Sequence, residues 1–412
     1  MPCSLLNWPV LMLPALLLMT ALVSGEGVAF ALGSDDERSD IQLRRPWIDR
    51  ARPQATSHGF LVRTDLSSEA TDRLVEAVFQ ARSDLDELLG APAPRGLERP
   101  HLLFFADPDE LDFTMRSECV VPGFRSQGSA RTFANDSGQW LLISTEAGNA
   151  LALHRDLRAA AAQQYLDARF GTRLPPWLHE GLLEYAAAFH QLGSKRIPGE
   201  PPSDFVTCLR ALDASGDWLA PSQLAALDRD QWPGDQEETS LQMRAQAWAI
   251  LHFLMHGPPA LGTNRIRGLV ADAVSDSFQP FEITAPSDSE KALLAAYAAH
   301  LRGLEVGPVT RLRELGEQLR ATLEEAEALG IRITEVGALQ SRCPRPIPHS
   351  VELRLKQTRS KESPRALRAL KLSDPPMSVL LEQPGAGRVR ISWMISSDSN
   401  ETQARWIPVV DW

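Results

Sequence analysis

The first third of the chain alternates between short apolar runs and one long amphipathic stretch. Three runs are apolar or β-branched and predict strands of a small sheet: 60–63, 101–106 and 140–144. After the first run, Ser67 or Ser68 can cap a helix that ends near Gly90. We expect the buried stripe of this helix to consist of Leu74, Val78, Leu85 and Leu88.

Helical spacing of apolar residues then continues from Gly148 to Gly330. Clusters of Pro and Gly interrupt it near 173–176, 197–202, 232–234 and 257–262. The last helix, at about 309–329, carries one leucine stripe: Leu312, Leu315, Leu319 and Leu323. On its other side, residues are spaced to form ion pairs: Arg313 with Glu317 and Arg320 with Glu324. A sheet followed by helices predicts an α+β domain over residues 55–330.

Beyond residue 330 the pattern becomes alternating and β-branched, with Pro and Gly between the segments. This predicts a small antiparallel β domain over residues 331–412, with strands at 351–356, 378–381, 389–395 and 405–410. Between 342 and 371, basic residues outnumber acidic ones. We favour a solvated strand face over a patch for anionic lipid or nucleic acid, because no aromatic residues interleave these charges.

The N-terminus carries a targeting pattern. Residues 5–23 are mostly apolar, and Ala29-Phe30-Ala31 forms a small-residue cleavage pattern. We therefore expect residues 1–31 to be a secretory signal or an uncleaved membrane anchor. Residues 32–54 are rich in Asp, Arg and Pro, which is typical of a flexible leader. We expect an exported protein, periplasmic or extracellular, that contacts a membrane only through residues 1–31.

Composition narrows the class of protein. A chain of 412 residues with 43% hydrophobic residues is large enough for two globular domains. Its net charge of -11 argues against nucleic acid as a partner, because such proteins need a basic face. If Cys3 leaves with the signal, an odd set remains, so one disulfide at most can form among Cys119, Cys208 and Cys343.

The segment from Trp177 to Tyr185 has the pattern W-L-x-E-G-L-x-E-Y. Together with the helix A-Q-A-W-A-I-L-H-F-L at 245–254, it resembles the peptidase MA-like gluzincin family of exported bacterial proteins, over about residues 55 to 305. The resemblance implies a gluzincin-like metallopeptidase-type fold, in which Glu180 occupies the position of the third zinc ligand. Glu184 would orient this site or pack near it.

The family also requires an HExxH motif on the preceding helix, and here that register falls on Ala159, Ala160 and Gln163. Histidines at i and i+4 reach one metal ion from a single helix face, while the glutamate activates a bound water. Two methyl groups and an amide supply neither the imidazoles nor the base. The sequence thus predicts no catalytic residues and no metal cofactor, with Trp177, Glu180, Glu184 and Tyr185 left as a binding site.

Two rearranged metal sites remain as alternatives. His154, His179 and Glu180 could hold zinc with Asp156 as base, although His154 lies more than one turn too early and adjacent residues diverge by about 100° around a helix. His252 and His256 are also one turn apart. Because Phe253 replaces the expected glutamate and the helix is apolar, we expect these two to be core or capping histidines.

These observations predict an exported, catalytically inactive gluzincin-like pseudo-peptidase that binds an unidentified peptide or protein. One alternative is an active zinc metallopeptidase with a rearranged site. Another is a structural or adaptor protein of the envelope that binds through its C-terminal β domain. No nucleic-acid partner is expected.

Overall fold

The computed structural model describes residues 52–55, 58, 60–90, 100–107, 109–111, 114, 125–127, 130–135, 138–145, 150–192, 195–233, 237–257, 262–275, 289–357, 376–384, 386–396 and 405–411. All of them belong to one compact unit, Ile48–Trp412. The predicted signal or anchor at 1–31, most of the predicted leader and Cys119 lie outside the described residues.

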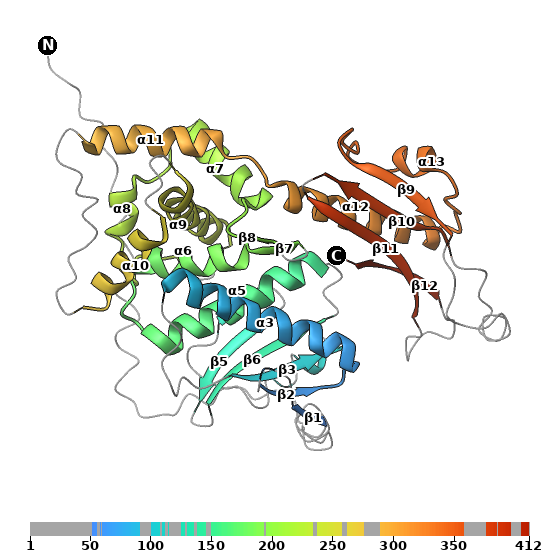
Figure 1. The fold of residues 1–412 in the computed structure, drawn as a ribbon, viewed down its shortest axis with the longest axis horizontal. Helices are drawn as coiled ribbons and strands as arrows, with labels where there is room; N and C mark the ends of the chain where they lie inside the picture. Colours follow the sequence, from blue (N-terminus) through green and yellow to red (C-terminus); the bar gives the residue numbers. More distant parts are fainter. Residues whose placement is uncertain are drawn as a thin grey trace, which may run out of the picture. The chain divides into compact units, whose positions relative to one another are not determined.

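Among the described residues, six strands form the N-terminal sheet in the order β1-β2-β3-β6-β5-β4 (Figure 1). Their bounds are β1 Arg52–Ala55, β2 Leu61–Thr64, β3 His101–Phe105, β4 Arg125–Gln127, β5 Ala130–Asn135 and β6 Gly138–Ser144. The strands β2, β3 and β6 are parallel, and the other pairings are antiparallel. The strand β1 begins at Arg52, so residues 52–54 of the stretch 32–54 that the sequence assigned to a flexible leader lie in a strand.

The helix α3, Ser68–Leu89, begins and ends where its capping residues predict. Ser67 accepts a hydrogen bond from the Ala70 backbone N–H, and Gly90 adopts a left-handed φ of 71°. Its residues Val75 and Val78 share a core with Phe104 of β3 and Leu157 of α5. These two helices therefore bury the apolar face of the sheet.

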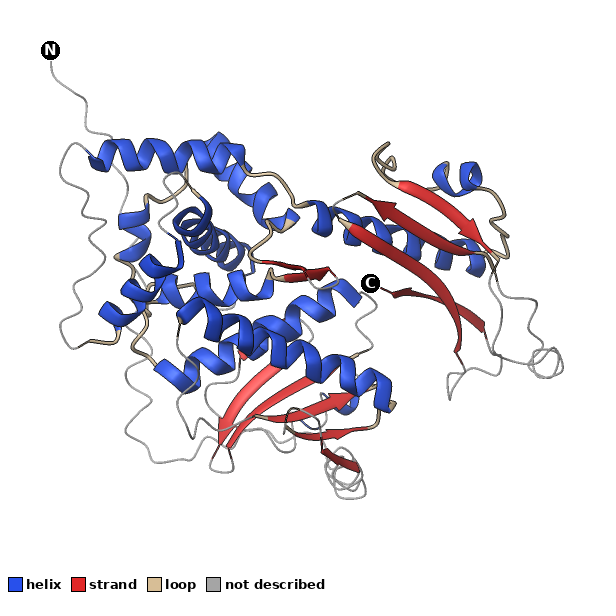
Figure 2. Ribbon diagram, in the orientation of Figure 1, coloured by secondary structure: helices blue, strands red, loops and turns tan. Residues whose placement is uncertain are grey.

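The helical half consists of α5 Ala150–Phe170, α6 Pro176–Ala187, α7 Ser203–Ser215, α8 Pro221–Ala225, α9 Glu237–His256, α10 Gly262–Ala273 and α11 Ser289–Gly303 (Figure 2). One antiparallel hairpin, β7 His190–Leu192 with β8 Lys195–Ile197, interrupts it. Its three-residue strands are too short to leave an alternating pattern, so the sequence did not predict them.

Helices α6 and α9 approach each other closely at Gly181. A Cβ on this residue would lie 2.9 Å from the carbonyl oxygen of Ala247, so the contact requires a residue without a side chain. Trp177 and Tyr185 of α6 and Trp248 of α9 are nearly inaccessible to solvent. The motif W-L-x-E-G-L-x-E-Y thus belongs mainly to the centre of the helical core.

The C-terminal part is a sheet of four described strands, covered on one face by the helix α12 Pro308–Ala328. The strands β9 Glu352–Lys356, β10 Ser378–Gln383, β11 Gly387–Ser396 and β12 Arg405–Asp411 are antiparallel, in the order β12-β11-β10-β9, and the short helix α13 Val336–Gln340 precedes them. This confirms the mixed α+β class and the separate antiparallel sheet. Leu319 of α12 shares a core with Leu381 and Ile391, so this core extends before residue 331, where the sequence placed the domain boundary.

Glu200 of the helical half caps α12. Its carboxylate oxygens accept hydrogen bonds from the backbone N–H groups of Val309 at 3.0 Å and Thr310 at 2.7 Å. An acidic side chain at a helix N-terminus satisfies unpaired N–H groups and interacts favourably with the helix dipole. The cap therefore fixes the start of α12 against the helical half.

The thiol of Cys343 is free. Among the described segments, no helix combines the length and apolar character needed to cross a bilayer.

Candidate functional site

The three positions that would carry HExxH in an active gluzincin are buried on α5. Ala159 packs in the same core as Trp177 and Leu178 of α6, whereas Ala160 packs in the core beneath the sheet. Neither methyl group can bind a metal ion or accept a proton. Gln163 is 1% exposed and contributes the one polar side chain of the three.

Gln163 belongs to a chain of polar contacts that ends at Glu180. Its Nε2 donates to Asp167 Oδ2 at 3.4 Å, and Asp167 Oδ1 lies 3.1 Å from His179 Nε2. The other ring nitrogen, Nδ1, lies 3.6 Å from Glu180 Oε1. We call these four residues the His179 network. The expectation that the side chains of His179 and Glu180 diverge is wrong, because the long Glu180 side chain turns back towards the ring.

His179 is charged in this network at neutral pH. Burial by itself lowers its pKa, but hydrogen bonds to Asp167 and Glu180 outweigh burial and raise the pKa to about 9. A protonated imidazole has both nitrogens occupied by hydrogen and no lone pair for a metal ion. Glu180, the ligand position implied by the family resemblance, therefore lies beside a cation.

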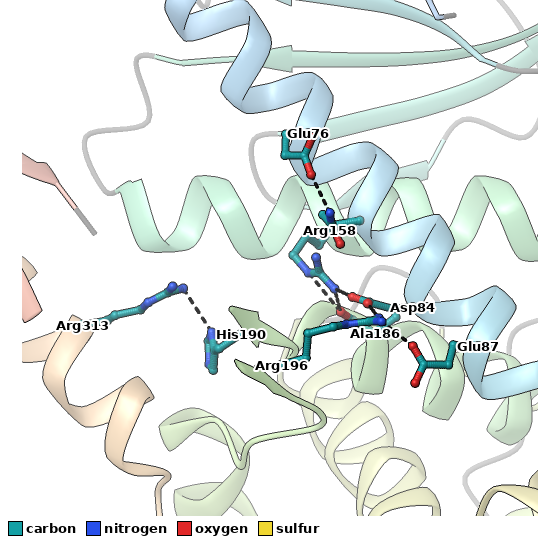
Figure 3. Close-up of polar contacts among 9 residues, drawn as sticks. Glu76, Asp84, Glu87, Arg158, Ala186, His190, Arg196 and Arg313 are labelled. Carbon is teal, nitrogen blue, oxygen red and sulfur yellow. Dashed lines mark hydrogen bonds and ion pairs between the residues drawn. The ribbon is translucent and has the colours of Figure 1, made fainter. Parts of the chain in front are cut away.

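His154 belongs to a different group of side chains. Burial, together with the charges of Arg158 and Arg313 and the nearby His190, holds its pKa well below the usual range. Figure 3 shows part of this group: Arg313 contacts His190, and Arg158 contacts Asp84 and the Ala186 carbonyl. The structure thus ties His179 to Glu180 but places His154 with other partners.

Glu184 anchors four helices from a fully buried position. It accepts a hydrogen bond from Arg244 Nε of α9 at 2.6 Å and one from Arg155 Nη2 of α5 at 3.2 Å. Arg155 also reaches Asp204 of α7 at 2.8 Å. Burial raises the pKa of Glu184, but the two guanidinium groups outweigh it and lower the pKa overall. Glu184 is therefore an ionised structural residue.

The other two expected binding residues are also internal. Trp177 is 1% exposed, and Tyr185 is fully buried with its hydroxyl 2.8 Å from His256 Nε2. Of the four residues proposed from sequence as a binding site, Glu180 alone is not buried, with 15% of its side chain exposed. A partner could reach Trp177, Glu184 or Tyr185 only if the core opened, so these three are corrected to core residues.

Three histidines form a second polar cluster, of which the sequence predicted two, His252 and His256. His252 Nδ1 lies 2.9 Å from His300 Nε2, and the rings of His252 and His256 are 4.6 Å apart. His252 is buried as expected, but His256 is exposed. Helical spacing predicts the pair on α9, whereas His300 follows His252 by 48 residues and no local pattern connects them.

No family model, curated protein or solved structure matches this chain. The resemblance to gluzincins rests on the two sequence blocks at 177–185 and 245–254.

Proposed function

We propose that this chain is an exported, catalytically inactive gluzincin-like pseudo-peptidase that binds a peptide or protein. The observation that carries the proposal is the His179 network, in which Asp167 and Glu180 hold an imidazolium beside the expected ligand position. The order of α5 and α6, and their placement beside a small mixed sheet, support the family resemblance.

The chemistry of the network explains why catalysis is not expected. A metal ion at Glu180 would need His179 to lose a proton that two carboxylates stabilise. Ala159 and Ala160, buried in packed cores, supply neither a second nitrogen ligand nor a base for activating water. Glu180 is left without the ligands that its role in the family requires.

The exposed side of the network favours a basic ligand group. Asp167 is 39% exposed and Glu180 15%, so both carboxylates reach solvent. The two carboxylates exceed the one imidazolium by one negative charge, although Arg244 of α9 also interacts with Glu180. The more exposed Asp167 is therefore the main attraction for a lysine or arginine side chain or a peptide N-terminus. We therefore place the binding role at Asp167 and Glu180.

The test combines a peptide-cleavage assay with a binding assay on the full chain. With zinc added, a peptide library should show no cleavage above the blank, and Glu180→Ala should change nothing. Binding of lysine-containing peptides should weaken in Asp167→Asn and Glu180→Gln. Glu69→Gln is the control, because it also removes one negative charge from an exposed side chain. Zinc-dependent cleavage that Glu180→Ala abolishes would support the active-peptidase alternative instead.

The outer face of the C-terminal sheet supports a second candidate, an adaptor. On this face Arg354 and Arg390 flank Leu380 on the neighbouring strands. Glu352 and Glu382 lie on the same face and pair with Arg354 and Arg388, so its basic excess comes from the exposed Lys356 and Arg390. Such a surface would bind an acidic partner. Lys356→Glu with Arg390→Glu should then reduce binding of the purified protein to acidic polypeptides, whereas Glu180→Ala should not.

A further inference from the structure

Three of the nine histidines meet at one place on the helical half. His252 and His256 lie one turn apart on α9, and His300 lies on α11. Their rings are separated by 4.6 Å between His252 and His256 and by 5.1 Å between His252 and His300. Two histidines at i and i+4 with a third from a neighbouring helix can supply three nitrogen ligands to one metal ion.

Aromatic neighbours orient two of the rings. Trp248 packs against His252 at 4.6 Å, and Phe253 meets His300 edge-on at 5.3 Å. The cluster is therefore built from packed side chains, and holding ligands in place before binding lowers the cost of ordering them.

Tyr185 orients the third ring by a hydrogen bond. When His256 Nε2–H donates to the Tyr185 hydroxyl, 2.8 Å away, its Nδ1 carries the lone pair. Metal-binding histidines commonly donate their second N–H to an oxygen in this way, which fixes the tautomer and raises ligand basicity. The hydrogen bond to Tyr185 would therefore hold the His256 ring in the tautomer that binds a metal ion through Nδ1.

Two of the three rings reach the surface of the helical half. Access is open because His256 is exposed and His300 is partly exposed.

One pair of nitrogens in the cluster already lies near the spacing that a metal ion requires. Among the described residues, no group of three His, Cys, Asp or Glu side chains could hold a metal ion as the side chains stand, so binding requires the His256 ring to turn towards the other two. His252 Nδ1 and His300 Nε2 are 2.9 Å apart, whereas two nitrogens on a tetrahedral zinc ion are roughly 3.3 Å apart for Zn–N bonds of about 2.05 Å. A metal ion between these two nitrogens would take the place of the hydrogen that they share. Each neutral ring would then carry its proton on its other nitrogen, His252 on Nε2 and His300 on Nδ1, so neither ring loses a proton to solvent.

We propose that His252, His256 and His300 form a binding site for a divalent transition metal of the zinc, nickel or copper class. His252 Nδ1, His256 Nδ1 and His300 Nε2 are the ligands, and the exposed side of His256 leaves a fourth position for solvent. Neutral imidazole favours these metals over magnesium or calcium. The site joins α9 to α11 and is separate from Glu180, so it does not depend on the proposed pseudo-peptidase function.

The experiment measures zinc binding to the untagged full chain by titration calorimetry and uses cobalt as a probe of tetrahedral nitrogen coordination in visible spectra. We expect one ion per chain and a raised melting temperature. His252→Gln and His300→Gln should each weaken binding by at least about tenfold. Tyr185→Phe should weaken it by roughly 10- to 100-fold.

Two controls separate this site from others. His349→Gln, which removes an exposed histidine of the C-terminal part, and Glu69→Gln, which removes an exposed carboxylate, should bind zinc as the parent does. Circular dichroism of each variant identifies any loss of folding, and the partly exposed His300 makes His300→Gln the more tolerant of the two ligand variants. Absence of binding, or binding that folded His300→Gln leaves unchanged, would overturn the proposal. Loss of binding in Glu180→Ala would place the metal at the gluzincin position and overturn the proposed function as well.

Discussion

Glu184 and Arg244 form a buried ion pair that joins α6 to α9, with Arg244 Nε donating to Glu184 Oε1 at 2.6 Å. Arg155 completes the arrangement from α5 and continues to Asp204 on α7. Because Glu184 is fully buried, its charge depends on these two guanidinium groups. The stability of the helical half should therefore respond strongly to this residue.

Removing the charge of Glu184 should destabilise the protein severely. Glu184→Gln leaves Arg244 without its carboxylate partner and Arg155 with Asp204 alone, and breaking a buried pair costs about 3–5 kcal/mol. Urea unfolding followed by circular dichroism measures the change. Glu69→Gln, which breaks the exposed pair with Arg73, should cost at most about 1 kcal/mol. Equal effects of the two substitutions would contradict a structural role for Glu184.

The same pair should weaken in acid. Since the folded-state pKa of Glu184 lies below its ordinary value of 4.5, its contribution to stability is complete above about pH 4.5. It is lost as the pH falls through the folded-state pKa. The difference in unfolding free energy between the parent and Glu184→Gln should shrink on acidification, as urea titrations at a series of pH values would show. A difference that does not change with pH would mean that Glu184 is already protonated in the folded protein.

The His179 network should have the opposite pH dependence. The pKa of His179 rises from 6.5 to about 9 on folding, so its contribution to stability is complete below about pH 6.5. That contribution is lost as the pH rises through about 9. In NMR spectra of histidine-labelled protein, the His179 ring should remain protonated at neutral pH. Asp167→Asn should shift its titration to lower pH, and a His179 ring that is neutral at pH 7 would contradict the network.

Gly181 should not tolerate a side chain. Alanine favours a helix over glycine by up to about 1 kcal/mol, but here its Cβ would press on the Ala247 carbonyl, a backbone atom that cannot turn away. Gly181→Ala should therefore destabilise by about 1–3 kcal/mol in urea unfolding. Gly268 on α10 has open space around its Cβ position, so Gly268→Ala should stabilise slightly. A stabilising Gly181→Ala would show that the two helices can separate at little cost.

Local patterns accounted for much of the secondary structure. Ser67 and Gly90 bound α3 as expected, because capping depends on residues within one turn of the helix end. The four strands after residue 330 follow from alternation along each segment. Arg320 and Glu324 pair at 2.8 Å on one helix, as their spacing predicts.

Contacts between elements were not visible in the sequence. Arg313, expected to pair along its own helix, donates to His190 of β7. His300 joins His252 from a distant helix. Neither contact leaves a periodic signal, because partners far apart in the chain have no fixed spacing.

The sequence by itself determined where most helices and strands lie and that Ala159, Ala160 and Gln163 offer neither an imidazole nor a carboxylate, since both depend on residue type and short-range spacing. Tertiary structure decided that Glu184 is an ionised anchor, that Glu180 faces an imidazolium, and that three histidines converge. Helix crossings bring these groups together, and the packing of the whole core sets those crossings.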